Sequence, residues 1–489
     1  MDFLSLHARI RPTALAVKDL SFAREWNYVQ FNRCVAKVAA RLQQQGISAG
    51  DRLACLAKNR AEIVALHLAC ARLGVMFVPL NWRLTSAELH AILADCTPSL
   101  LYADEQGHSH QLDYTDINRL FADSEALAPL PEKHIDQQRP SLILYTSGTT
   151  GKPKGVMLSE ANLAETAINF SLLGKVDSHS SFLCESPMFH IIGLITSVRP
   201  ALYNGANIVI SDGFIPERTL SRLSATELAI THYFCVPQMA NALRQEPSFD
   251  PQKLKHLTAI FTGGAPHPAV QIHSWLNDGI PIVDGYGMSE AGTVFGMPVD
   301  IALIAAKAGS VGFESFRLQA RIADEDDCEV PVGQPGEVQL KGPNVTLGYW
   351  QREAEFAASL SADGWFKTGD IATKDSDGYY RIVDRKKDMF ISGGENVYPT
   401  EIEAAVMRID SILECALIGV PDERWGEVGC LYVVPKKQCA PEKQQIIDFL
   451  QDCLARYKLP KHIIITDSLP RNGGGKVMKH VLKQGYVNL

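Results

Sequence analysis

The first hundred residues alternate between short apolar runs and segments with helical spacing. Apolar residues recur at helical intervals over 27–46 and again over 61–73, and runs of strand length occupy 51–57 and 75–79. Parallel strands need a crossover between them, so this rhythm predicts βαβ units in a parallel-type sheet. Further runs of the same kind lie at 181–184, 206–210, 228–234 and 257–262.

The texture changes after Leu318. Residues 321–333 and 336–342 indicate short strands with tight turns, hence a small β-rich subdomain. Beyond Lys387, two helical segments alternate with strand-like runs, as in a compact α+β unit. The predicted fold is therefore α/β, with a large multi-subdomain N-terminal region at 1–386 and a smaller, mobile C-terminal domain at 387–489.

Bulk composition narrows the class of protein. A hydrophobic content of 46% and a charged content of 21% are typical of a soluble globular chain. A net charge of −8 argues against a nucleic-acid partner, and no apolar run is long enough for a membrane span. The eleven cysteines include no Cys-x-x-Cys pair, which favours reduced thiols and a cytoplasmic location.

A dense polar loop follows the apolar run at 142–144. Hydroxyls, glycines and two lysines crowd the segment Thr146-Ser147-Gly148-Thr149-Thr150-Gly151-Lys152-Pro153-Lys154. Glycines let backbone N–H groups approach an anion, and hydroxyl and ammonium groups add donors and charge. The segment predicts a polyphosphate cradle and differs from the Walker A pattern, because Pro153 follows Lys152. An ordinary surface turn is the alternative.

A second glycine pair, in Thr262-Gly-Gly-Ala265-Pro266, comes directly after an apolar strand. Ligands of open α/β sheets bind at the carboxyl ends of strands. We therefore expect Gly264 and its neighbours to form a flat backbone shelf against adenine, with Tyr286 stacking from the other side. A tight turn without a ligand is the alternative.

Five motifs, in order, resemble those of the acyl-adenylate-forming enzymes, and within that superfamily the chain looks like a fatty-acyl-CoA synthetase. They are residues 145–156, Asp284-Gly285-Tyr286-Gly287-Met288-Ser289-Glu290, residues 364–370, residues 377–388 and residues 469–476. The resemblance implies that Asp284, Gly285 and Gly287 belong to the nucleotide site. It also implies that the Ser289 hydroxyl binds a phosphate oxygen and that the Glu290 carboxylate binds Mg²⁺. The family usually has threonine at the position of Ser289.

The later motifs imply roles around a hinge. Asp370 resembles the carboxylate that binds the ribose hydroxyls, and Ile382 and Arg385 resemble other nucleotide contacts. Lys387 falls where the family places its hinge. The loop Ser392-Gly393-Gly394 would line the channel for the pantetheine arm of CoA.

Lys476 resembles the lysine that bridges the acid and the α-phosphate. Attack of a carboxylate on a phosphate brings two anions together, and a positioned ammonium offsets their repulsion. Three consecutive glycines precede Lys476, more than the motif usually has.

His190 resembles the family residue beside the acyl carboxylate, although a lone histidine is often structural. An uncharged, elongated acid pocket is predicted from apolar and small residues nearby. Those named for it are Ile191, Ile192, Phe234, Val236, Met288, Ala291 and Gly292.

The resemblance implies an acid–thiol ligase that uses ATP, Mg²⁺ and CoA, with a medium- or long-chain fatty acid as the first choice of substrate. Aryl acids such as hydroxycinnamates or succinylbenzoate, and a carrier-protein acceptor, stay open. A nucleotide sensor and a phosphotransferase are rivals from other classes; the second would release ADP. A homodimer and a peripheral membrane contact are also left open.

Overall fold

The computed structural model describes residues 2–147, 153–265, 267–392, 395–436, 441–471 and 477–486. The chain divides into two compact units, one formed by Met1–Gln319 with Lys341–Phe366 and the other by Ala320–Leu340 with Lys367–Leu489. The boundary predicted from the sequence, at Lys386–Lys387, falls inside the second unit. Movement of residues 387–489 as a separate domain therefore stays a prediction.

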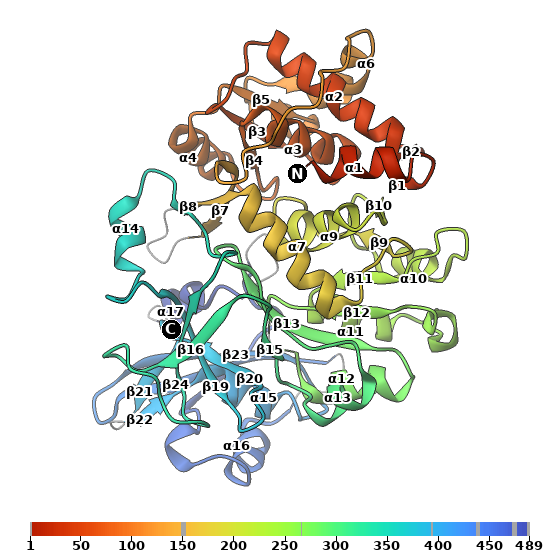
Figure 1. The fold of residues 1–489 in the computed structure, drawn as a ribbon. Helices are drawn as coiled ribbons and strands as arrows, with labels where there is room; N and C mark the ends of the chain where they lie inside the picture. Colours follow the sequence, from red (N-terminus) through yellow and green to blue (C-terminus); the bar gives the residue numbers. More distant parts are fainter. Residues whose placement is uncertain are drawn as a thin grey trace. The chain divides into compact units, whose positions relative to one another are not determined.

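The first unit contains two large mixed sheets (Figure 1). The strands of the nine-stranded sheet are, in spatial order, β15 (Phe313–Glu314), β14 (Gly292–Gly296), β13 (Ile282–Met288), β12 (Ala259–Thr262), β11 (His232–Cys235), β9 (Ser181–Cys184), β10 (Asn207–Ile210), β1 (Leu15–Asp19) and β2 (Arg24–Asn27). Its central pairs, from β1 to β13, are parallel, as the βαβ rhythm predicts.

The seven-stranded sheet has a parallel part and an antiparallel edge. Its order is β18 (Gly348–Tyr349), β8 (Pro153–Ser159), β7 (Pro140–Ser147), β4 (Met76–Pro79), β3 (Arg52–Leu56), β5 (Leu100–Ala103) and β6 (Thr115–Asp116). Strands β7 and β8 form an antiparallel hairpin, which the sequence analysis did not foresee. Proline and glycine are typical of loops, but Pro153 and Gly155 belong to strand β8 because they are paired with Ser147 and Tyr145 of β7.

Helices of the first unit follow local signals. Helix α3 (Ala61–Leu73) ends at Gly74, whose φ of 71° closes the helix in the left-handed region. Helix α7 (Glu160–Gly174) begins after Ser159, which caps it by accepting from the Asn162 N–H. The others are α1 (Phe3–Ile10), α2 (Tyr28–Gln44), α4 (Ser86–Cys96), α5 (Glu105–Ser109), α6 (Leu120–Glu125), α8 (Ile191–Gly193), α9 (Arg199–Tyr203), α10 (Pro216–Ser224), α11 (Pro237–Gln245), α12 (Ala269–Asn277), α13 (Ile301–Ala306) and α14 (Glu353–Ala358).

The second unit holds the β-rich part and the α+β part. Strands β16 (Gln319–Ala323), β17 (Gly336–Lys341), β19 (Phe366–Lys374) and β20 (Tyr380–Arg385) form one sheet. The other sheet runs β22 (Glu395–Val397), β21 (Phe390–Ser392), β24 (Gly426–Pro435) and β23 (Ile412–Asp422), with β25 (His462–Ile465) beside β24. Its helices are α15 (Pro399–Val406), α16 (Lys443–Gln451) and α17 (Lys479–Tyr486).

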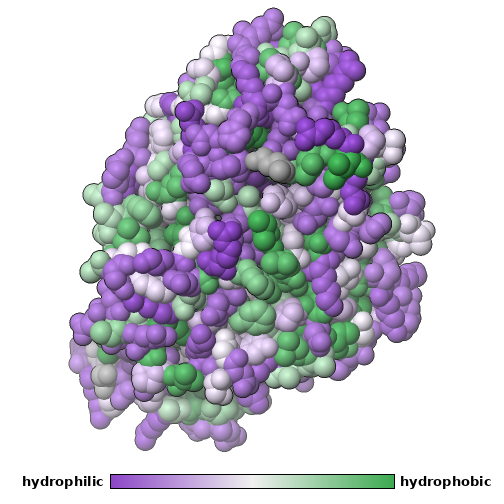
Figure 2. Space-filling view, viewed as in Figure 1, coloured by the Kyte–Doolittle hydropathy of each residue, from purple (hydrophilic) through white to green (hydrophobic). Residues whose placement is uncertain are grey.

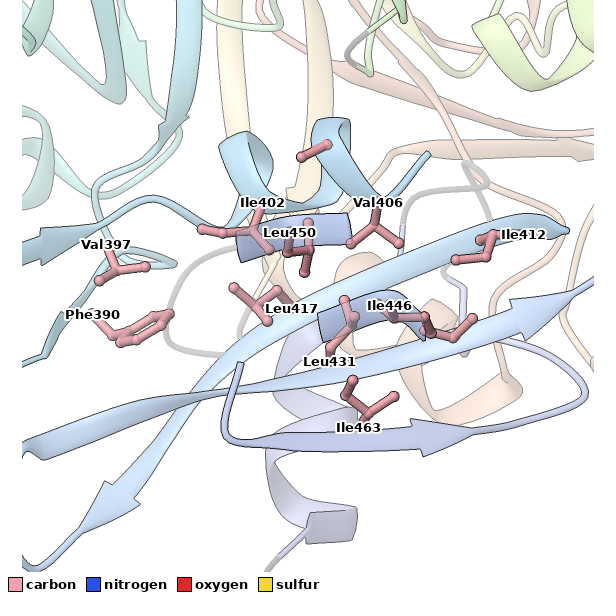
Figure 3. Packing of buried hydrophobic residues seen from close by; sticks show 12 residues of the cluster. Phe390, Val397, Ile402, Val406, Ile412, Leu417, Leu431, Ile446, Leu450 and Ile463 are labelled. Carbon is pink, nitrogen blue, oxygen red and sulfur yellow. The ribbon is translucent and has the colours of Figure 1, made fainter. Parts of the chain in front are cut away.

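The core of this α+β part joins helices to the long hairpin β23–β24 (Figure 3). Ile402 and Val406 of α15 pack with Ile446 and Leu450 of α16 and with the strand residue Leu417, all of them buried. Burial of large aliphatic side chains contributes roughly 1.5–3 kcal/mol each. This cluster gives the small unit its own core.

The surface carries mixed chemistry. On the face shown in Figure 2, hydrophilic residues surround smaller hydrophobic groups. None of the helices that the described residues form has both the length and the apolar character that crossing a membrane requires.

Candidate active site

One edge of the nine-stranded sheet gathers the predicted adenine shelf, the Asp284–Glu290 motif and the predicted acid pocket. Strands β9, β11, β12 and β13 are parallel, so their carboxyl ends meet at this edge. In the register, Cys235 is paired with Thr262, and Thr262 with Asp284. The segments after these strands therefore lie close together, at the edge where open α/β sheets bind ligands.

The predicted adenine shelf is exposed backbone. Gly264 has a φ of +81° and is exposed, and a Cβ placed there would meet only the Ile192 Cδ1 atom, at 3.7 Å. Half-buried Ala265 follows it, and Pro266 lies outside the described residues. Gly264 thus leaves room for a flat ring to approach, and any other residue would be strained there.

Tyr286 lies on the neighbouring strand β13 and is half-buried. Its ring is stacked on Phe295 of β14, with centroids 5.6 Å apart and planes 28° apart. Gly285 and Gly287 flank it, and a Cβ on Gly287 would lie 2.4 Å from the Gly292 carbonyl oxygen. Glycine at 287 is therefore required by the tight hairpin β13–β14.

Asp284 sits under this edge in a polar group that the sequence analysis missed in part. Its side chain is 4% exposed, and the Thr262 hydroxyl donates to its Oδ1 atom at 3.0 Å. The same hydroxyl lies 2.9 Å from Nδ1 of His267. Burial raises the pKa of Asp284 to about 8 and lowers that of His267 to about 4, so both groups are mainly neutral at pH 7.

Ser289 and Glu290 occupy the turn between β13 and β14, and both are half-buried. The Glu290 carbonyl accepts from the Thr346 N–H at 2.6 Å, and its Oε1 atom accepts from the Tyr349 hydroxyl at 3.3 Å. A partly exposed carboxylate held in this way fits Mg²⁺, which usually takes one or two protein carboxylates together with phosphate oxygens and water. No group of three or more metal-ligating side chains occurs among the described residues.

The predicted phosphate cradle coincides with the β7–β8 hairpin. Residues 148–152 lie outside the described residues, and so does the Ser147 side chain. Thr146 is half-buried and is the cross-strand partner of Lys154. Lys154 lies on β8, where its ammonium group pairs with Glu355 at 2.8 Å.

The stem of this hairpin is fixed from outside. The Tyr145 hydroxyl donates to Oδ2 of Asp95 at 2.5 Å, and Arg352 reaches the other carboxylate oxygen at 3.3 Å. Arg352 also donates to the Pro153 carbonyl. The stem is therefore anchored at both strands.

His190 begins the acid side of the edge. Its backbone N–H donates to the Pro187 carbonyl at 3.1 Å, and within the described part of the chain the buried Nε2 atom of its ring has no hydrogen-bond partner. Burial, and then the charge of Arg83, lower the pKa of His190 to about 4. The Nε2 atom of a neutral imidazole can donate to a ligand oxygen when it carries the ring proton.

The predicted acid pocket divides into two groups. Half-buried side chains at the edge are Ile191, Ile192, Phe234, Val236 and Met288. The Ile191 Cδ1 atom would lie 3.6 Å from a Cβ on Gly287, and the Phe234 ring would lie 3.6 Å from one on Gly263. Isoleucine and phenylalanine side chains therefore face the glycines of the predicted nucleotide site.

Ala291 and Gly292 lie deeper than this edge. Ala291 is fully buried, and the space beside Gly292 is filled by the Thr166 side chain, 2.2 Å from a built Cβ. These two residues are packed beneath the edge in this structure, and their contact with an acid stays a prediction.

The second unit brings two predicted nucleotide residues into direct contact. Asp370 of β19 and Arg385 of β20 are cross-strand partners, with the Arg385 Nε atom 3.2 Å from Oδ1 of Asp370. Asp370 is 5% exposed, whereas Arg385 is exposed. Half-buried Ile382 lies on the same strand as Arg385.

The predicted hinge and CoA-channel residues follow β20. Lys387 is exposed in the turn between β20 and β21, and Ser392 is buried at the end of β21, paired with Glu395. Gly393, Gly394 and Lys476 lie outside the described residues, so their predicted roles stay predictions.

Thr262, His267 and Tyr349 were not foreseen. Thr262 and His267 flank the Gly-Gly pair, which is the only signal that pointed to them. Tyr349 lies far along the chain from Glu290, and no local pattern indicates that they meet.

Comparison with known proteins identifies the family of this chain. Residues 4–350 match the family model "AMP-binding enzyme", and residues 401–476 match "AMP-binding enzyme C-terminal domain". The chain thus belongs to the AMP-binding enzyme family.

Individual relatives extend over nearly the whole chain. A feruloyl-CoA synthase from an Amycolatopsis species is 37% identical over 98% of this chain and 97% of its own. The long-chain-fatty-acid–CoA ligase FadD13 of Mycobacterium tuberculosis is 34% identical over 99% and 97%. The solved O-succinylbenzoate CoA synthetase MenE of Bacillus subtilis, in complex with ATP and magnesium ion, has a TM-score of 0.87 at 28% identity and covers 99% of each chain. The protein is an ATP-dependent, AMP-forming acid–CoA ligase.

Proposed function

We propose that the protein joins an aromatic carboxylic acid of the hydroxycinnamate kind to CoA. The observation that carries this proposal is its 37% identity, over 98% of the chain, to a feruloyl-CoA synthase. The sequence analysis put a fatty acid first, and a fatty-acid ligase at 34% identity keeps that substrate as the second candidate.

The apolar edge is compatible with an aromatic acid. The Phe234 ring packs at 5.8 Å from Phe170 and at 6.2 Å from Phe261, measured between centroids. Aromatic pairs prefer such separations, and a substrate ring could extend the cluster toward Gly263. The five half-buried side chains at this edge are uncharged. An apolar ring that packs on them would therefore leave none of their groups as an unpaired buried charge.

The reaction has two steps. The acid carboxylate attacks the α-phosphate of ATP, forming a carboxyl–phosphate bond and releasing pyrophosphate. The CoA thiol then attacks the acyl carbon, a thioester bond forms, AMP leaves and the thiol proton passes to solvent. Magnesium, held by Glu290, would offset the charge of the phosphates when bound.

We assign the remaining roles to this chain's own residues. The 146–154 segment would bind the leaving phosphates, and Asp370 would bind the ribose. Lys476 would contact both the acid carboxylate and the α-phosphate and offset their repulsion. Rotation about Lys387 would then replace Lys476 with the 392–394 loop for the CoA step.

A panel of acids tests the substrate. Pyrophosphate release with Mg²⁺, ATP and CoA is measured for ferulate, other hydroxycinnamates, succinylbenzoate and fatty acids of increasing length. We expect the highest kcat/KM with a hydroxycinnamate, by about tenfold or more, because even one extra or missing methylene in an apolar pocket changes the binding free energy by about 1–3 kcal/mol. A higher kcat/KM with a fatty acid would restore the first choice from the sequence.

A further inference from the structure

Residues 343–350, which we name the strap, lie against the β7–β8 hairpin, the predicted phosphate cradle, which we call the phosphate hairpin. Strand β18 of the strap pairs antiparallel with β8, with Tyr349 opposite Val156. The Thr346 hydroxyl donates to the Met157 carbonyl at 2.6 Å, and the Trp350 N–H donates to the Gly155 carbonyl at 2.7 Å. The strap therefore forms an added strand on the hairpin.

The strap also holds the Glu290 turn. The Thr346 N–H donates to the Glu290 carbonyl at 2.6 Å, and the Asn344 amide donates to the Ala291 carbonyl at 2.7 Å. The Tyr349 hydroxyl donates to the Glu290 side chain itself at 3.3 Å. The backbone and the carboxylate of Glu290 are thus held by one short segment.

Tyr349 is where the two sets of contacts meet. Its side chain is buried at 6% exposure, and the Lys154 ammonium lies 5.0 Å from its ring centroid. One side chain touches a lysine of the phosphate hairpin and the carboxylate predicted to hold magnesium.

We propose that Tyr349 is a positioning residue that orients the Glu290 carboxylate relative to the phosphate hairpin, so that Mg·ATP meets both in one fixed arrangement. This inference rests on the proposed role of Glu290. Outer hydrogen bonds of this kind fix the direction of a metal-binding carboxylate, and their loss typically weakens metal affinity by about 10- to 100-fold.

Calorimetric binding separates positioning from simple stability. Tyr349→Phe keeps the ring and removes the hydroxyl, and we expect Mg·ATP to bind about tenfold or more weakly. AMP measured without magnesium should bind as it does to the wild type. Tyr102→Phe is the matched control, because that buried tyrosine donates to Gln45 at 2.8 Å, away from these residues. Its binding of both nucleotides should be unchanged.

Glu290→Gln and the double variant distinguish the two levels of the claim. If Glu290→Gln weakens Mg·ATP binding and Tyr349→Phe does not, the positioning role is wrong while the proposed metal role stands. If Glu290→Gln leaves Mg·ATP binding unchanged, the metal role itself fails. Positioning through Glu290 also requires that the double variant lose no more than Glu290→Gln alone. Equal weakening of AMP and Mg·ATP by Tyr349→Phe would indicate a structural role only and overturn the inference.

Discussion

Asp370 and Arg385 are partners across the hairpin β19–β20, with the arginine Nε atom 3.2 Å from the aspartate carboxylate. Both were expected to touch the nucleotide, and in the structure they touch each other. The pairing fixes the direction of a buried carboxylate whose oxygens suit two adjacent ribose hydroxyls.

Removal of this carboxylate should weaken nucleotide binding. We expect Asp370→Ala to raise the Kd for AMP by about 10- to 100-fold, because hydrogen bonds to a charged group contribute roughly 1.5–3 kcal/mol. Isothermal calorimetry measures it. Asp326→Ala, an exposed turn residue of the same unit, is the control and should bind AMP normally. Normal binding by Asp370→Ala would remove the ribose assignment.

Asp284 should make stability depend on pH. Its pKa rises on folding from an ordinary 3.8 to about 8, so the folded protein binds the proton more tightly than the unfolded chain. Its contribution is therefore fully present below about pH 4 and is lost as the pH rises toward 8. Asp284→Asn should gain thermal stability relative to the wild type between about pH 5 and about pH 8.5.

The check for Asp284 is a pair of melting curves at each pH. Asp113→Asn, at an exposed aspartate, should show a constant difference from the wild type over that range. A constant difference for Asp284→Asn as well would mean that Asp284 is ionised when folded.

Ile192 should help to set the fit of the acid. Its Cδ1 atom lies beside Gly264, so Ile192→Ala would open space between the predicted acid pocket and the predicted adenine shelf. We expect KM for the preferred acid to rise about tenfold or more, with a smaller effect on KM for ATP. Ile215→Ala, an exposed isoleucine elsewhere, is the control. An unchanged acid KM would exclude Ile192 from the pocket.

Local signals predicted the elements whose boundaries depend on nearby residues. Helix α3 was foreseen from the helical spacing of apolar residues over 61–73, because periodicity acts within a few residues. Strand β8 was missed because Pro153 and Gly155 look like loop residues, while cross-strand bonds decide its state.

Contacts between segments far apart in the chain could not be predicted from the sequence. Parallel strands β12 and β13 bring Thr262 to Asp284, and the strap brings Tyr349 to Glu290. Neither pair has a spacing that marks it. The resemblance predicted the members of the site, whereas their burial and their pairing, which set their charge states, required the structure.

Acid-dependent exchange of labelled pyrophosphate into ATP, without CoA, tests the central claim most directly. The account predicts exchange with the wild type and a fall of about 10²- to 10³-fold or more in Lys476→Ala, because a positioned cation at the reacting phosphate is lost. Thioester formation from preformed acyl-adenylate should stay nearly intact in that variant. Wild-type exchange that needs no acid, or equal loss of both half-reactions in Lys476→Ala, would contradict the account.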